Sequence, residues 1–201
     1  MKPQLVLDAG GVLVSNLSPL FWEQLCEHAS IDYDVIVPHY KTSMSAALWR
    51  GEVSETEFWA WLAGGYPGVN ETAARQLLMS NLVRLDALDC LAVWRTRADL
   101  HLLSNHRTEW LLPVLEKELH LFSSITISSE IGSAKPQPEM FRVASSKLPA
   151  GAQVLFVDDQ PRNLQVAAEL GWTTLLADAD GNWVEEVGTL LGFEATATCR
   201  G

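Results

Sequence analysis

Residues with reactive or charge-binding side chains follow four short apolar runs of the sequence. They are Asp8 after LVL, Ser104 and Asn105 after LHLL, Lys135 in GSAKP after SITI, and Asp158 and Asp159 after VLFV. Taken singly, each has an ordinary structural explanation, because Asp, Ser and Asn commonly form turns or cap helices. Taken together, they offer a nucleophile, a cation and a group of carboxylates.

Clustered carboxylates require a source of positive charge, because they otherwise repel one another and take up protons. Mg²⁺ prefers oxygen ligands and commonly uses one or two carboxylates together with phosphate oxygens. Lys135 would add a fixed positive charge, and a carboxylate close to it would be able to attack a phosphorus centre. Ser104 and backbone N–H groups would orient the transferred group. These residue types therefore favour Mg²⁺-assisted phosphoryl transfer to a carboxylate.

The apolar runs that carry these residues are typical of a parallel sheet that is buried on both faces. The expected strands are 4–7, 100–103, 124–127, 153–157 and 173–177, and the expected helices between and around them are 86–97, 107–119, 137–148 and 161–170. This alternation predicts an α/β fold with a Rossmann-like, doubly wound parallel sheet. In such sheets ligands bind at the carboxyl ends of the strands, where the polar residues lie.

Residues 16–85 interrupt the alternation, because they contain only helical patterns. The expected helices are 19–29, 33–48, 54–64 and 71–82, and Ser54 with Glu57 forms a capping box at the third of them. An insert directly after the first strand would cover the carboxyl end of the sheet. We therefore expect a core domain of residues 1–15 and 86–201 and an inserted all-helical cap domain of residues 16–85.

The bulk composition limits the partners and the compartment. Of 201 residues, 48% are hydrophobic, and the formal net charge is −11, which argues against nucleic-acid and membrane-surface binding. The sequence shows neither a signal peptide nor a membrane-spanning run. Cys26, Cys90 and Cys199 are widely spaced, as expected for reduced thiols rather than a disulfide framework. We expect a cytoplasmic protein that acts on a small phosphorylated metabolite; the oligomeric state is not predicted.

The four stretches resemble, in order, the four motifs of the haloacid dehalogenase-like (HAD) hydrolase superfamily. The matching segments are LVLDAGGVLV, LLSN, IGSAKPQPEMF and VLFVDDQPRNLQVAAELGW. The resemblance implies that Asp8 is the nucleophile that becomes an aspartyl-phosphate, that Ser104 binds the phosphoryl group and that Lys135 is the motif lysine. It also implies a Mg²⁺ site at Asp8, the backbone carbonyl of Gly10, Asp159 and the adjacent Asp158.

The segment RGEVSETEFW, residues 50–59, resembles the helical (C1-type) cap of members related to the epoxide hydrolase N-terminal phosphatase and to sugar-1-phosphate phosphatases. This resemblance implies a phosphate monoester substrate, such as a sugar phosphate. The expected substrate-binding residues are Gly10, Gly11, Asn105 and His106 from the core, with Trp49 and Arg50 from the cap.

Gly10 departs from the family pattern, since most phosphatases of the family carry an aspartate there as general acid and base. The loss of such a group costs roughly 10²- to 10⁴-fold in rate. One possibility is a phosphatase for an easy leaving group, or one in which His106, His28 or His39 supplies the proton. A metal-independent 2-haloacid dehalogenase and a weakly active or non-catalytic binding protein are the alternatives. The Asp158–Asp159 pair favours the phosphatase, because halide displacement has no use for it.

Overall fold

The computed structural model describes residues 2–193, in which five parallel strands form one sheet. The strands are β1 (Gln4–Leu7), β2 (Asp99–Ser104), β3 (Phe122–Ile127), β4 (Val154–Asp158) and β5 (Thr173–Leu176). Their order is β3-β2-β1-β4-β5, so β1 lies at the centre. Every residue of β1 is buried, as its nearly continuous apolar sequence predicts. The predicted Rossmann-like α/β fold is confirmed.

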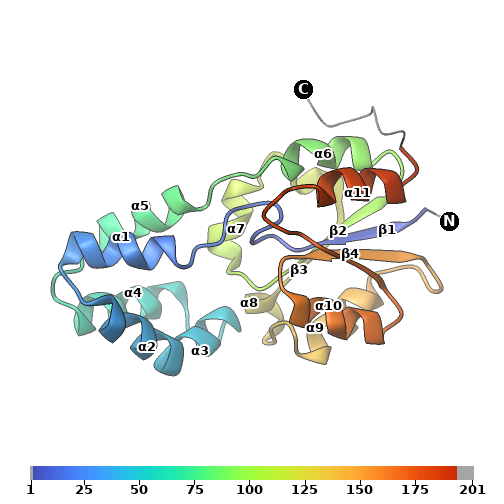
Figure 1. Cartoon of the computed structure of the whole chain (residues 1–201). Helices are drawn as coiled ribbons and strands as arrows, with labels where there is room; N and C mark the ends of the chain where they lie inside the picture. Colours follow the sequence, from blue (N-terminus) through green and yellow to red (C-terminus); the bar gives the residue numbers. More distant parts are fainter. Residues whose placement is uncertain (1, 194–201) are drawn as a thin grey trace.

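Helices cover both faces of the sheet. They are α6 (Ala87–Trp94), α7 (Thr108–Val114), α8 (Ser128–Ile131), α9 (Pro138–Ser146), α10 (Pro161–Glu169) and α11 (Trp183–Leu190), with a 3-10 turn at Leu119–Leu121. Figure 1 shows α6 and α11 on one face and α9 and α10 on the other. Alternate residues of β1 serve the two faces: Leu5 and Leu7 belong to the larger hydrophobic cluster, whereas Val6 packs with Phe141 and Phe156.

Five further helices lie between β1 and α6: α1 (Leu20–Ala29), α2 (Tyr33–Ser43), α3 (Ser45–Trp49), α4 (Glu55–Gly65) and α5 (Glu71–Asn81). Figure 1 shows them together beyond the end of the sheet toward which β1 runs. The capping box of Ser54 and Glu57 is present at the start of α4, as predicted. The helical insert is also confirmed, although its division from the sheet as a separate domain stays a proposal.

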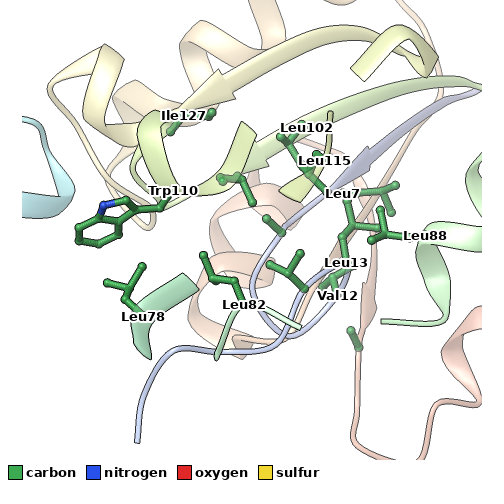
Figure 2. Packing of buried hydrophobic residues seen from close by; sticks show 14 of the residues in the cluster. Leu7, Val12, Leu13, Leu78, Leu82, Leu88, Leu102, Trp110, Leu115 and Ile127 are labelled. Atoms are coloured by element: carbon green, nitrogen blue, oxygen red, sulfur yellow. The ribbon is translucent and has the colours of Figure 1, made fainter. Parts of the chain in front are cut away.

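The insert shares a continuous hydrophobic core with the sheet. Figure 2 shows Leu78 and Leu82, at the end of α5, in the same packed group as Leu13 and Trp110. Each of these side chains is almost fully buried. This contact fixes the helical insert against the carboxyl edge of the sheet.

Several predicted elements differ from the structure. The helix expected over 33–48 is two helices that meet at Met44, and the helix expected over 107–119 ends at Val114. Pro113 removes a backbone donor in the last turn of that helix, which accounts for its early end. Two helices, α8 and α11, were not predicted.

The structure describes two of the three cysteines. Cys26 is a free, buried thiol, but Cys90 is disulfide-bonded, so the prediction of three reduced thiols is wrong at Cys90. Cys199 lies outside the described residues.

Within residues 2–193, no helix has the length and apolar character needed to span a membrane.

Candidate active site

The carboxyl ends of the central strands bring the predicted motif residues together. Asp8 directly follows β1, Ser104 ends β2, and Asp158 ends β4. Because β1 pairs in parallel with both β2 and β4, these three residues emerge at one edge of the sheet. Lys135, in the loop between α8 and α9, reaches the same edge and donates a hydrogen bond to the carbonyl oxygen of Leu103 at 2.9 Å.

Lys135 forms the centre of a buried charge cluster. Its Nζ lies 2.9 Å from Asp8 Oδ2 and 2.6 Å from Asp158 Oδ2. Burial alone would lower the pKa of Lys135, but the charges of Asp8 and Asp158 outweigh it and raise that pKa. Lys135 is therefore a permanent cation, held where a negatively charged group bound to Asp8 would meet it.

Burial has the opposite consequence for Asp8. Loss of solvent raises the pKa of its carboxyl group to about 7, against the attraction of Lys135, and the charge of Asp158 adds to the increase. One Asp8 oxygen accepts a hydrogen bond from the backbone N–H of Ala9 at 2.6 Å, and the other faces Lys135. A further cation at this edge would keep Asp8 ionised as a nucleophile must be.

Asp158 is fully buried and engaged by its neighbours. Besides Lys135, it accepts hydrogen bonds from the backbone N–H of Gln160 at 2.8 Å and from Asn163 Nδ2 at 2.9 and 3.0 Å. These contacts account for both carboxylate oxygens. Asp158 therefore serves the site chiefly by holding Lys135 in place.

Asp159 is only partly buried and has no cationic partner among the described residues. Its Oδ2 accepts hydrogen bonds from Asn16 Nδ2 at 2.8 Å and from Gln160 Nε2 at 3.0 Å. One oxygen from each of Asp8, Asp158 and Asp159 lies within 4.8 Å of the others. An all-oxygen donor set of this kind fits Mg²⁺.

Ser104 provides a second sign of a ligand site at this edge. Its Oγ is buried and has no hydrogen-bond partner in the described part of the chain. A buried polar atom without a partner is costly. A phosphoryl oxygen near Lys135 and Asp8 would accept the Ser104 hydrogen bond and remove that cost.

The turn after Asp8 depends on two glycines. Gly11 has a φ of +71°, and a Cβ atom there would lie 2.6 Å from Asp159 Oδ2. A Cβ atom on Gly10 would lie 2.7 Å from Asn16 Oδ1. The turn is therefore able to approach Asp159 closely only because Gly10 and Gly11 carry no side chain. Asn16 was not predicted at this site, although, like the predicted residues, it is a polar residue just after an apolar run.

Asn105 holds the loop that carries Lys135. Its Nδ2 donates to the carbonyl oxygen of Lys135 at 2.8 Å, and its Oδ1 accepts from the backbone N–H of the same residue at 2.7 Å. The structure thus gives the Asn105 amide a positioning task next to the site. Its predicted contact with substrate stays a prediction.

The predicted cap contacts and His106 lie in a neighbouring aromatic group. The ring of His106 packs 5.7 Å from that of Trp49, and its Nδ1 accepts from the backbone N–H of Arg107 at 2.9 Å. Burial lowers the pKa of His106 to about 4, so the ring is neutral at pH 7 and poorly suited to donate a proton. Arg50 pairs with Glu52 on the surface at 2.7 Å. Among the described residues, no hydrogen bond, ion pair or ring contact joins Trp49, Arg50 or His106 to the charge cluster.

The two histidines considered in the insert have other surroundings. His39 Nδ1 lies 2.8 Å from the hydroxyl group of Tyr66, and His28 lines a hollow between α1 and α5. Neither histidine forms a hydrogen bond or an ion pair with Asp8 or Lys135 in the described part of the structure. The geometry therefore offers no histidine that directly replaces the general acid missing at Gly10.

Backbone contacts hold the insert against the core beside the site. The buried guanidinium of Arg107 donates to the carbonyl oxygens of Leu48 at 3.1 Å and Val53 at 2.6 Å. Ser128 Oγ donates to the carbonyl oxygen of Trp49 at 2.6 Å. Neither Arg107 nor Ser128 was predicted, because their partners are backbone atoms of a distant segment.

Comparison with known proteins agrees with this geometry. The model of the haloacid dehalogenase-like hydrolase family matches residues 5–171. A D-ribitol-5-phosphate phosphatase of Bacteroides thetaiotaomicron is 27% identical over 206 residues, which cover 95% of this chain and 99% of that protein.

Two solved structures share the fold. A HAD family enzyme from Bacteroides thetaiotaomicron, in complex with magnesium and inorganic phosphate, superposes with a TM-score of 0.76 at 23% identity, over 91% of this chain and 98% of that one. A predicted HAD-like family hydrolase from Porphyromonas gingivalis gives 0.75 at 22% identity, over 96% and 100%. Because the family model spans most of the chain, including the four motif segments up to Gly171, the protein belongs to the haloacid dehalogenase-like hydrolase family.

Proposed function

We propose that the protein is a Mg²⁺-dependent phosphatase that hydrolyses a small phosphate monoester, such as a sugar phosphate. The observation that carries the proposal is the position of Asp8, which lies beside the buried Lys135 and within a cluster of three carboxylates. The similarity to a D-ribitol-5-phosphate phosphatase supports a small phosphorylated carbohydrate as the general substrate class.

In the proposed first step, an oxygen of Asp8 forms a bond to phosphorus while the ester bond to the leaving oxygen breaks. Lys135 lies 2.9 Å from Asp8 and neutralises negative charge on the phosphoryl oxygens. The unpartnered Ser104 Oγ donates a hydrogen bond to one of these oxygens. The product of this step is an aspartyl-phosphate on Asp8.

We assign the Mg²⁺ site to Asp8, Asp159 and the backbone carbonyl of Gly10, with Asp158 as an adjacent carboxylate. Bound there, Mg²⁺ would supply positive charge that stabilises the phosphoryl oxygens, as it does in phosphoryl-transfer sites generally. Asp158 is already engaged by Lys135 and Asn163, whereas Asp159 has no cationic partner in the described part of the chain. Asp159 is therefore the carboxylate that most needs a metal.

We further propose that residues 16–85 act as a cap domain over a core of residues 1–15 and 86–201. Contacts such as that of Ser128 Oγ with the Trp49 carbonyl hold the two parts together beside the site. A cap in this position would select small substrates and exclude polymers. Trp49 and Arg50 remain the proposed cap contacts.

The absence of a side chain at Gly10 restricts the proposed substrates. His106 is neutral and packed among aromatic rings, so it does not supply the missing acid. The leaving oxygen must therefore depart with little protonation by the enzyme. Substrates with an easily displaced oxygen, such as a sugar-1-phosphate, suit this site better than simple alkyl phosphates.

The test is phosphate release from a panel of phosphate esters, measured with Mg²⁺ and with EDTA, for the parent protein and for Asp8→Asn. We expect Mg²⁺-dependent release that Asp8→Asn abolishes, because the substituted amide is nearly the same size and is not a nucleophile. Release that survives Asp8→Asn, or no release from any ester, would contradict the proposal. Halide release from a 2-haloacid without metal would support the dehalogenase instead.

A further inference from the structure

The side chain of Asn16 fills the space that Gly10 leaves open. An ideal Cβ atom on Gly10 would lie 2.7 Å from Asn16 Oδ1, and one on Gly11 would lie 2.9 Å from Asn16 Nδ2. Asn16 is exposed to solvent, and it reaches this space from the segment that leads from β1 into the helical insert. The amide of Asn16 thus stands where a side chain at position 10 would begin.

A hydrogen bond fixes which end of the Asn16 amide faces Gly10. Nδ2 donates to Asp159 Oδ2 at 2.8 Å, and a carboxylate is able only to accept. The amide is therefore oriented with its nitrogen toward Asp159 and its oxygen toward Gly10. The space beside Gly10 is therefore occupied by Asn16 Oδ1, a hydrogen-bond acceptor that carries no proton to donate.

This orientation restricts what Asn16 is able to bind. The Oδ1 atom accepts a hydrogen bond from a molecule that carries hydrogen, such as water, and offers nothing to a bare ester oxygen. In an in-line displacement, the leaving oxygen and the later attacking water occupy the same side of phosphorus. Asn16 Oδ1 is therefore suited to bind the attacking water and not the leaving oxygen.

We propose that Asn16 Oδ1 binds and orients the water that hydrolyses the phosphorylated Asp8, an inference that rests on the proposed function above. In this step the water oxygen forms a bond to phosphorus, and the bond from phosphorus to the Asp8 oxygen breaks. Its electron pair restores the Asp8 carboxylate, and the second water proton passes to a phosphoryl oxygen. Asn16 orients the water without accepting a proton.

Oxygen exchange between inorganic phosphate and water isolates this step, because it requires formation and hydrolysis of the aspartyl-phosphate with water as the only leaving group. The parent protein, Asn16→Ala and the matched control Glu27→Gln, an exposed residue of α1, are incubated with ¹⁸O-labelled phosphate and Mg²⁺. We expect exchange by Asn16→Ala to be roughly tenfold slower, the effect of one neutral hydrogen bond. Glu27→Gln should match the parent.

A second measurement separates water binding from an effect on Asp159. The first turnover of p-nitrophenyl phosphate reports formation of the aspartyl-phosphate, and its dependence on Mg²⁺ concentration reports the metal site. We expect Asn16→Ala to retain both the parent burst rate and the parent Mg²⁺ requirement. A slower burst with a raised Mg²⁺ requirement would show that Asn16 acts by positioning Asp159, and would overturn the proposal.

The outcomes also separate this inference from the proposed function. If Asp8→Asn abolishes p-nitrophenolate release but Asn16→Ala exchanges oxygen at the parent rate, only the role of Asn16 is overturned. If Asp8→Asn releases p-nitrophenolate as the parent does, the proposed function itself fails.

Discussion

On one side of Asp8, the side chains of Lys135, Asp158 and Asn163 are buried and joined by ion pairs and hydrogen bonds of 2.6 to 3.0 Å. On the other side, Gly10, Asn16 and Asp159 are partly or fully exposed, and a hydrogen bond of 2.8 Å joins Asn16 to Asp159. We refer to these groups as the buried side and the open side. Both lie within reach of the same carboxylate.

The difference indicates a division of tasks. The buried side places a cation beside Asp8 before any substrate arrives, so little reorganisation is needed when charge develops. In the proposed reaction, the open side would face the parts that change, namely the metal, the leaving oxygen and the water. We therefore expect substitutions on the buried side to determine whether the reaction occurs, and those on the open side to determine which substrates react and how fast water attacks.

The largest expected effect comes from Lys135→Met on the buried side. This change leaves Asp8 and Asp158 buried without their cation, and we expect roughly a 10²- to 10³-fold loss of activity and a loss of about 3–5 kcal/mol in unfolding free energy. Denaturant unfolding and phosphate release measure both effects. Lys147→Met is the control, because Lys147 also donates to a strand carbonyl, that of Ile125, but lies on the surface. Equal losses of activity and unfolding free energy in Lys135→Met and Lys147→Met would contradict the proposed role of the buried side.

Asp158→Asn and Asp159→Asn test the two sides at adjacent positions. Asp158→Asn removes one partner of a buried ion pair, so we expect it to lower the unfolding free energy by about 3 kcal/mol. Asp159→Asn removes a partly exposed charge and should change stability by less than about 1 kcal/mol. Its main effect should be a higher Mg²⁺ concentration for half-maximal activity. Equal losses of unfolding free energy in Asp158→Asn and Asp159→Asn, or the same Mg²⁺ requirement in both, would contradict the division between the buried side and the open side.

The sequence predicted the buried side well, for a physical reason. Asp8, Lys135 and Asp158 each lie at or beyond the end of a short apolar run, and parallel strands bring such ends to one edge. The same argument predicted the sheet and placed the helical insert over it. The resemblance to a known family then assigned roles that the apolar pattern alone does not provide.

The open side and the insert contacts were less predictable. Asn16 reaches the site because two glycines let the turn approach Asp159, and no periodic pattern encodes that approach. The burial of His106 beside Trp49 depends on how the insert docks. The break at Met44 was missed because apolar residues continue at helical spacing through both α2 and α3.

Gly10→Asp tests the open side through leaving-group dependence. The new Cβ atom would meet only the end of the Asn16 side chain, which is able to rotate away. A carboxyl group there would protonate the leaving oxygen, so we expect turnover of alkyl phosphates to rise by about 10²-fold relative to p-nitrophenyl phosphate.

Gly11→Asp is the matched control for that change. Gly11 has a φ of +71°, and its Cβ atom would meet Asp159 Oδ2 at 2.6 Å. We expect Gly11→Asp to lower turnover of both substrates, because it disturbs the backbone and the metal site together. An equal rise for alkyl and p-nitrophenyl phosphates in Gly10→Asp would show that the enzyme already protonates the leaving group by another route.

The smallest expected effect is the release of less than one proton when Mg²⁺ binds. It shows whether the buried side or the metal on the open side determines the charge of Asp8. Burial raises the pKa of Asp8 to about 7 in spite of Lys135, so the metal-free carboxyl is mostly protonated near pH 6. Mg²⁺ favours the carboxylate, and its binding should release most of one proton near pH 6 and almost none near pH 9. Calorimetric titration with Mg²⁺ in two buffers of different ionisation enthalpy measures this release, and Asp8→Asn should abolish it. Equal heats in both buffers near pH 6 would mean that Lys135, on the buried side, already keeps Asp8 ionised without the metal.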